Sequence, residues 1–133
     1  MDTILSVETL AGLLLAVLLG GLVGWEREKS SRPAGLRTHM LVCLGSFLFT
    51  LVSLSFSSDP ARIAAGIVAG IGFIGAGTIW GQKDKIQGIT TAASLWITAA
   101  IGLAIGVEDY PLAVVAAIIV FIILIVKRPL KNA

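Results

Sequence analysis

The chain has 133 residues, of which 56% are hydrophobic and 14% charged, with ten Lys and Arg against eight Asp and Glu. Its mean hydropathy of +0.97 excludes an ordinary soluble domain and is typical of a membrane protein with several spans. The single cysteine, Cys43, excludes an internal disulfide and any metal site built from several cysteines.

Five apolar segments follow one another, each long enough to cross a hydrocarbon core about 30 Å thick. They cover residues 7–24, 38–57, 60–81, 90–106 and 111–126. Asp59 before Pro60 is a helix-start signal, and Pro111 suits the first turn of the last helix. The sequence therefore predicts an all-α membrane protein, with five transmembrane helices in a single transmembrane domain over residues 1–133.

Basic residues predict the orientation of these helices. Nine of the ten Lys and Arg would lie on one side of the membrane, and Arg62 alone on the other. The nine are Arg27, Lys29, Arg32, Arg37, Lys83, Lys85, Lys127, Arg128 and Lys131. Because basic residues are retained on the cytoplasmic side, we expect the N-terminus outside and the C-terminus in the cytoplasm. This distribution also argues against a nucleic-acid partner.

The third apolar segment is rich in glycine, and its residues 70–75 match the pattern G-x-G-x-x-G. In a dinucleotide-binding unit that pattern follows a strand and precedes an acidic residue about 20 positions on. Here it lies in the middle of an apolar run, and Ser94, Leu95 and Trp96 occupy the distant positions. The glycines are better explained as close contacts between helices in lipid.

Small residues recur every fourth position in the first and fourth segments, so each set lies on one helix face. The third segment has small residues on more than one face: Ala65, Ala69, Gly72 and Ala76, and separately Gly66, Gly70 and Gly77. We expect that helix to be contacted from several sides, and the bulky fifth helix to face lipid. The expected packing glycines are Gly20, Gly24, Gly66, Gly70, Gly72, Gly75, Gly77, Gly102 and Gly106.

A shift of 53 residues aligns several positions of the two halves of the chain. It places Gly24 on Gly77, Gly35 on Gly88 and Thr38 on Thr91. We interpret this as a faint parallel repeat of two helical hairpins, with chance similarity as the alternative.

The densest polar stretch, residues 25–39, joins the first two segments. An ordinary solvated loop explains much of it, but Glu26, Arg37 and His39 lie against helix ends, where an unpaired charge is costly. We therefore expect a Glu26–Arg37 ion pair. His39 is interpreted first as a hydrogen-bonded structural group and second as a proton relay. On the other side, Asp59, Glu108 or Asp109 are candidates to neutralise Arg62.

No catalytic motif is present: the lone histidine and cysteine form no H-E-x-x-H pattern, and no serine elbow occurs. Carboxylates are absent from the middle of the apolar segments, so a dedicated magnesium cage is not expected. We predict a non-enzymatic protein that needs neither a metal centre nor a cofactor.

Several motifs together resemble the membrane domain of the MgtC/SapB family, in order and spacing. They are residues 24–28 (GWERE), 33–39 (PAGLRTH), 41–46 (LVCLGS), 62–65 (RIAA), 70–77 (GIGFIGAG) and 88–96 (GITTAASLW). The resemblance covers residues 10–107. The positions it carries over are Glu26, Arg27, Arg37, Thr38, His39, Arg62, Thr90 and Thr91, together with the glycines.

This resemblance implies a multi-pass protein of the bacterial inner membrane, from a family linked to adaptation to low magnesium and, in pathogens, to survival inside host cells. Two functions follow as alternatives: helix-mediated contact with a second copy or another membrane protein such as the F-type ATP synthase, or transport of magnesium or another cation or solute. We expect a homodimer in the bilayer.

The sequence departs from the family pattern in two respects. Many members carry a cytoplasmic ACT-like domain after the last helix, and the resemblance here is to the transmembrane domain only. Members also usually have glutamine and serine where this chain has Gly66 and Ala69. The loss of these polar side chains weakens the expectation of a solute site along the third helix.

Overall fold

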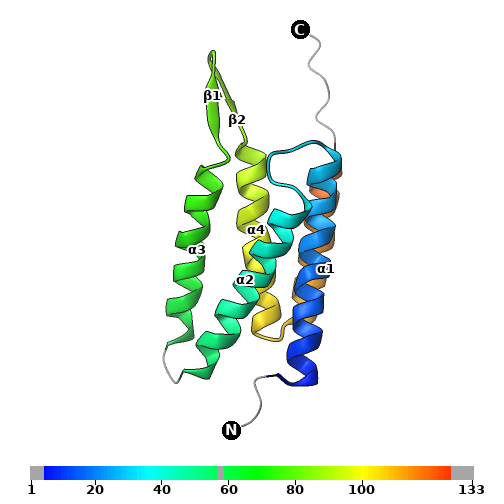
Figure 1. Cartoon of the computed structure of the whole chain (residues 1–133), viewed down its shortest axis with the longest axis vertical. Helices are drawn as coiled ribbons and strands as arrows, with labels where there is room; N and C mark the ends of the chain where they lie inside the picture. Colours follow the sequence, from blue (N-terminus) through cyan, green and yellow to red (C-terminus); the bar gives the residue numbers. More distant parts are fainter. Residues whose placement is uncertain (1–4, 57–58, 127–133) are drawn as a thin grey trace.

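The computed structural model describes residues 5–56 and 59–126, which form five α-helices and one β-hairpin (Figure 1). The helices are α1 (Val7–Lys29), α2 (Leu36–Ser55), α3 (Pro60–Ala76), α4 (Ile89–Gly106) and α5 (Tyr110–Ile125). The strands are β1 (Trp80–Gln82) and β2 (Lys85–Gln87). The predicted all-helical bundle is confirmed. By length and composition, three of these helices, α1, α2 and α4, can cross a membrane, whereas α3 and α5 are shorter apolar helices.

Helix α1 is longer than predicted, because it continues past Gly24 to Lys29. Its start is capped by the Ser6 side chain, which accepts a hydrogen bond from the backbone N–H of Thr9. Arg27 and Lys29 lie in its last turn, where positive charge is favourable beside the negative end of the helix dipole. Glu26 and Arg27 are therefore held on a helix and do not belong to a loop.

Helix α3 is shorter than predicted, and the expectation of a helix over residues 60–81 is wrong at its C-terminal end. The helix ends at Ala76, and Trp80–Gln82 pairs antiparallel with Lys85–Gln87. Lys83 and Asp84 form the two-residue turn, both with positive φ, as a tight hairpin requires. The hairpin projects beyond the bundle, at the end where α1 finishes (Figure 1).

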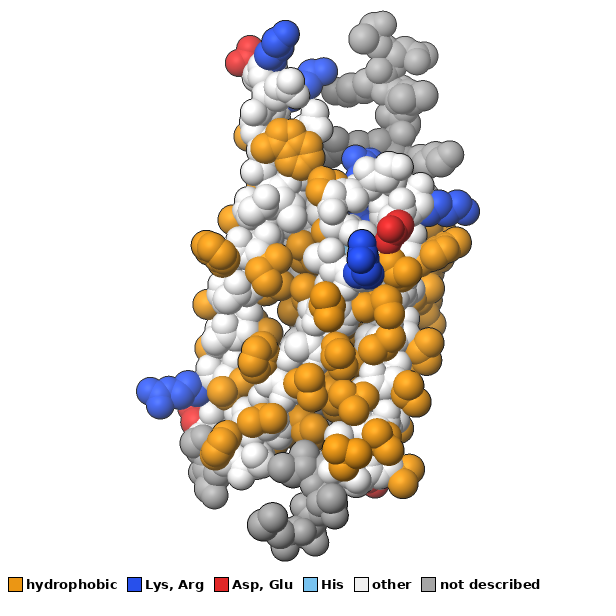
Figure 2. Space-filling view, in the orientation of Figure 1, with side chains coloured by type: hydrophobic (Ala, Val, Ile, Leu, Met, Phe, Trp, Pro, Cys, Tyr) orange, Lys and Arg blue, Asp and Glu red, His pale blue; other side chains and the backbone are white. Residues whose placement is uncertain are grey.

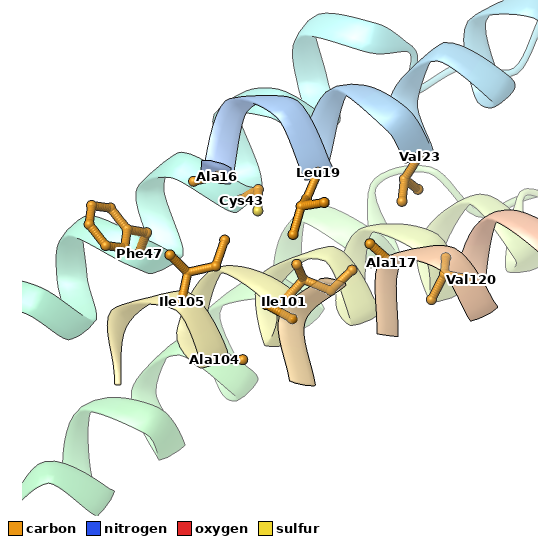
Figure 3. Packing of buried hydrophobic residues seen from close by; sticks show 11 residues of the cluster. Ala16, Leu19, Val23, Cys43, Phe47, Ile101, Ala104, Ile105, Ala117 and Val120 are labelled. Atoms are coloured by element: carbon orange, nitrogen blue, oxygen red, sulfur yellow. The ribbon is translucent and has the colours of Figure 1, made fainter. Parts of the chain in front are cut away.

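The hydrophobic core lies between α1, α2, α4 and α5. Figure 3 shows side chains of these helices converging, with Leu19 and Val23 of α1 near Ile101 of α4 and Ala117 of α5. One face of α5 is buried there, through Ala113, Ala117 and Val120. Its remaining surface is largely exposed apolar side chains, including Ile119 and Ile123.

Glycines let α2 approach both α1 and α4 closely. A Cβ added at Gly20 would lie 2.7 Å from the His39 carbonyl oxygen, and one at Gly24 would lie 2.8 Å from the Leu36 Cα. An added Cβ at Gly102 would collide with the Cys43 carbonyl. Gly106 is similarly close to Thr50, another α2 residue. Helix α2 is therefore contacted from several sides, and α4 packs against all four of the other helices.

Within the described residues, α3 is contacted by α4 and, less extensively, by α2, and the rest of its surface is open. Only Ile71 and Gly75 of this helix are buried. Gly66, Gly70 and Gly72 have no atom within 4 Å of the position where a Cβ would lie. Gly75 contacts Ala92 of α4, and Gly77 caps the C-terminal end of α3.

The two helical hairpins of the suspected repeat run in the same direction, with α1 and α3 antiparallel to α2 and α4 (Figure 1). Gly35 and Gly88, which the repeat aligns, are the N-cap residues of α2 and α4. The connections differ, since an irregular loop joins α1 to α2 and a β-hairpin joins α3 to α4. Duplication stays a hypothesis.

Candidate functional site

A buried ion pair lies in the last turns of α1. The Arg27 Nε donates to Glu26 Oε2 at 2.6 Å, and the two side chains are only 5% and 8% exposed. The second carboxylate oxygen of Glu26 accepts from the Ser30 hydroxyl at 2.7 Å. Both Glu26 oxygens thus have a donor, which is the condition under which a charge is tolerated away from water.

The predicted Glu26–Arg37 pair is wrong, because Glu26 is paired with Arg27. Arg37 lies in the first turn of α2 with its side chain exposed, so solvent takes the place of a protein partner. The prediction placed Glu26 on a loop opposite α2. Continuation of α1 to Lys29 instead brings the neighbouring guanidinium to the carboxylate within the same helix.

His39 is completely buried and connects α2 to α4. Its Nδ1 lies 2.9 Å from the Gly35 carbonyl oxygen, and its Nε2 lies 2.9 Å from the Ser94 hydroxyl oxygen. Because a carbonyl only accepts, Nδ1 carries a proton, and in a neutral ring Nε2 accepts from Ser94. Ser94 also lies 2.7 Å from the Thr91 carbonyl, so its one proton serves two acceptors.

A seam of hydroxyl groups continues this contact along α2 and α4. Ser46 of α2 donates to the Ala99 carbonyl of α4, and Thr98 donates to the Ser94 carbonyl within α4. In lipid such bonds hold helices together, because the alternative is an unsatisfied polar group. The four-residue spacing of Ser94 and Thr98 was interpreted only as a small-residue face, so sequence reasoning missed the partner of His39.

The sequence also did not predict the role of Glu28. Its Oε2 accepts from the backbone N–H of Leu36 at 2.6 Å, across the loop between α1 and α2. The N-cap residue of α2, Gly35, has no side chain to do this. Glu28 therefore supplies from α1 the capping carboxylate that α2 lacks, which only the loop geometry reveals.

The buried polar side chains described above, Glu26, Arg27, His39 and Ser94, are called the cluster below. The remaining predicted residues do not join this cluster as one site. Thr91 is buried and offers its carbonyl to Ser94, whereas Thr90 is exposed. Thr38 lines a groove between α2 and α3, and Arg62 lines the same groove near the opposite end of the bundle. Within the described residues Arg62 forms no ion pair, so neutralisation by Asp59, Glu108 or Asp109 is not seen.

The cluster offers hydrogen-bonding and charge, and little for a metal ion. Nowhere in residues 5–56 and 59–126 do three His, Cys, Asp or Glu side chains gather closely enough to hold one. The carboxylate of Glu26 already accepts hydrogen bonds from Arg27 and Ser30.

The fold and this cluster together indicate the class of protein to which the chain belongs. On the face shown in Figure 2, apolar side chains cover the surface along the length of the bundle, and charged side chains lie toward its ends. Three helices are long and apolar enough to span a bilayer, and, apart from the Ser53 hydroxyl, the buried side-chain polar groups of the described residues are hydrogen-bonded. These are the properties of a helical membrane protein.

The chain belongs to the MgtC family, whose sequence model matches residues 13–133. It is 42% identical over 130 residues to the "Putative magnesium transporter YhiD" of Escherichia coli K12, covering 90% of this chain and 60% of that protein. It is 45% identical over 120 residues to "Protein MgtC" of Salmonella typhimurium LT2, covering 90% of this chain and 52% of the relative.

Protein MgtC of Brucella abortus is 44% identical over 125 residues, covering 92% of this chain and 52% of the relative. The chain therefore spans 52–60% of the length of these curated relatives. No solved structure matches significantly. The resemblance to the family drawn from the sequence motifs is confirmed.

Proposed function

We propose that this chain is a multi-pass protein of the bacterial inner membrane in which all five helices cross the bilayer. Helices α3 and α5 have 17 and 16 residues and are about 24–26 Å long, close to the thickness of the hydrocarbon core. In the described residues, Arg62 lies at one end of the bundle, and the other basic residues of the connections, including Arg32 and Lys83, lie at the other. This distribution supports the N-terminus outside and the C-terminus inside.

Within that membrane, the proposed function is non-enzymatic. The protein contributes to magnesium homeostasis and adaptation to low magnesium through helix-mediated contact, as a homodimer or with another membrane protein. The observation that carries this proposal is the outer face of α3, formed by Ala65, Ala69, Gly72 and Ala76. All four are exposed. The spacing of four, three and four residues keeps them on one side of the helix, where a second helix can approach closely.

A disulfide trap tests this contact. In a background with Cys43 replaced by serine, an Ala69→Cys variant should form a cross-linked dimer in oxidised membranes. An Ile119→Cys variant, exposed on α5, is the control and should stay monomeric. Addition of Gly72→Leu should abolish the cross-link and growth at low magnesium in a bacterial strain that depends on this protein. A monomer under all conditions would remove the dimer from the proposal, and retained growth would remove the role of this face.

The alternative function is transport of magnesium or another cation or solute. It is favoured by the name of one relative, "Putative magnesium transporter YhiD", and by polar groups at both ends of the bundle. In this alternative, Glu26, Arg37 and His39 form one gate and Arg62 the other. Flux of magnesium into proteoliposomes that is lost in a Glu26→Gln variant shown by circular dichroism to be folded, but not in the exposed Glu8→Gln control, would support it. Absence of flux with the unmodified protein would reject it.

A further inference from the structure

A groove of about 640 Å³ lies between α2 and α3. It exists because the walls carry glycine: Gly45 on α2 and Gly66 and Gly70 on α3 have no atom within 4 Å of a Cβ position. Its lining is otherwise mainly apolar, with Phe49 and Ile74 among the larger side chains. The volume is in the range of small-ligand sites, and an apolar wall with a few polar groups is their usual chemistry.

A positive charge lies at one end of this groove. Arg62 lines it from the first turn of α3, and within the described residues it forms no ion pair. The carboxylate closest to Arg62 in the sequence, Asp59, caps the helix, with Oδ1 accepting from the Ala61 N–H at 3.0 Å. The N-terminal end of a helix adds its own positive potential. Arg62 is thus the one charged side chain among the described residues that lines the groove, and it can bind an anionic group at this end.

An unpaired hydroxyl lies nearby. Ser53 of α2 is 4% exposed, and its Oγ has no hydrogen-bond partner among the described residues. It lines a smaller cavity of about 220 Å³ that shares Ile63 with the groove. Thr50, one turn earlier on α2, instead bonds the Ser46 carbonyl at 2.8 Å. Ser53 is thus a free donor at the same end as Arg62.

We propose that this groove binds one phospholipid, with its phosphate at Arg62, its ester region near Ser53 and one acyl chain along Gly66 and Gly70. The distance along α3 from Arg62 to Ile74 is about 18 Å, which is close to the depth of one leaflet, about 15 Å. If the membrane orientation holds, Arg62 lies at the outer interface, where a phosphate belongs. The ligand enters sideways from the bilayer.

A helix of a second copy fits this groove less well. A helix with its side chains is about 10–12 Å wide, so it can rest on the rim but not fill a slot between two helices. A partner related by a two-fold axis along the membrane normal would also place a second Arg62 at the same depth as the first, and like charges repel. The proposal goes beyond the helix contact proposed above, which uses the opposite face of α3.

The test uses the full chain in vesicles that contain phosphatidylglycerol with a photoreactive diazirine on one acyl chain. After illumination, mass spectrometry should find the label concentrated on residues of α2 and α3 that line the groove. Gly70→Leu fills the groove and should lower that labelling about tenfold, and Gly66→Leu should act likewise. Gly72→Leu, on the opposite face of α3, is the matched control and should leave labelling unchanged.

A second arm tests the phosphate. Diacylglycerol carrying the same photoreactive chain should label the groove about tenfold less than the phospholipid, the effect of one charge-assisted hydrogen bond. Arg62→Gln should remove this difference, and Arg62→Lys should keep most of it. Helical content measured by circular dichroism verifies that each variant is folded.

Two outcomes would overturn the lipid site. Labelling spread evenly over exposed α5 and unchanged by Gly70→Leu or Gly66→Leu would show only bulk lipid contact. A disulfide dimer through Gly70→Cys would show that a second copy occupies the groove. Because Ala69→Cys reports on the other face of α3, failure of the lipid proposal is distinguishable from failure of the helix-contact proposal.

Discussion

At the scale of single residues, the partner of each buried polar group depends on which side chain the fold places within hydrogen-bonding distance. Glu26 was expected to pair with Arg37 across the loop, but α1 continues and Arg27 is beside it. The importance of His39 could be inferred from its place at a helix end. Its partner, Ser94, lies 55 positions away in the chain, and spacing within a single helix carries no signal for such a contact.

Removal of the Ser94 hydroxyl should destabilise the bundle. Ser94→Ala leaves the Nε2 of the fully buried His39 without its partner. We expect a loss of about 1–2 kcal/mol in the free energy of unfolding in detergent micelles. Ser55→Ala, which removes an exposed hydroxyl bonded to the Val52 carbonyl, is the control and should change little. Equal stability of both variants would show that the His39 contact is energetically unimportant.

Removing one partner of the buried ion pair should lower the free energy of unfolding more than replacing both partners. Glu26→Gln leaves the Arg27 guanidinium buried without a carboxylate, and the expected loss is about 3–5 kcal/mol. The double variant Glu26→Gln with Arg27→Met removes the unpaired charge and should recover most of that stability. Unfolding in micelles measures both. If the double variant is as unstable as the single one, the cost is not that of an unpaired charge.

At the scale of elements, the hairpin between α3 and α4 is the clearest difference from the sequence analysis. The apolar run continues through Trp80 and Gly81, so hydropathy alone extended the helix to residue 81. The helix ends earlier because Gly77 caps it and Thr78 turns, with its hydroxyl bonded to the Gly75 carbonyl at 2.7 Å. Gly88, at φ +89°, then starts α4.

Gly88→Ala should disrupt this connection. The left-handed backbone disfavours any side chain by about 1–2 kcal/mol, and the added Cβ would also collide with the Thr78 carbonyl. We expect lower stability and faster tryptic cleavage at Lys83 and Lys85. The matched variant Gly81→Ala has open space around its Cβ position and should resist trypsin like the original chain. Equal cleavage of the two variants would contradict the strained role of Gly88.

At the scale of the whole molecule, the distribution of charge supports the proposed orientation in the membrane. The α1–α2 loop and the hairpin lie at the same end of the bundle (Figure 1), and the connection around Arg62 lies at the other. A bundle with this arrangement can cross a membrane only if its two ends lie on opposite sides. The proposed orientation thus depends on the basic residues of the connections at one end of the bundle.

Cysteine accessibility checks this orientation. In a Cys43→Ser background, Lys83→Cys at the hairpin tip should react with a membrane-impermeant maleimide only after the cells are opened. Ser55→Cys, exposed at the end of α2, should react in intact cells because the proposed topology places it on the outer side. The reverse pattern would invert the proposed topology, and labelling of both from outside would exclude it.

The sequence by itself determined that this is a bundle of five apolar helices in the MgtC family, because hydropathy, helix caps and motif order are local properties of the chain. It located residues such as Glu26 and His39 near helix ends for the same reason. Only the tertiary structure decided which helices meet. A glycine face shows where a neighbour can approach, but the identity of that neighbour depends on the whole arrangement. Gly20 and Gly102 therefore contact α2, whereas Gly66 and Gly70 border an open groove.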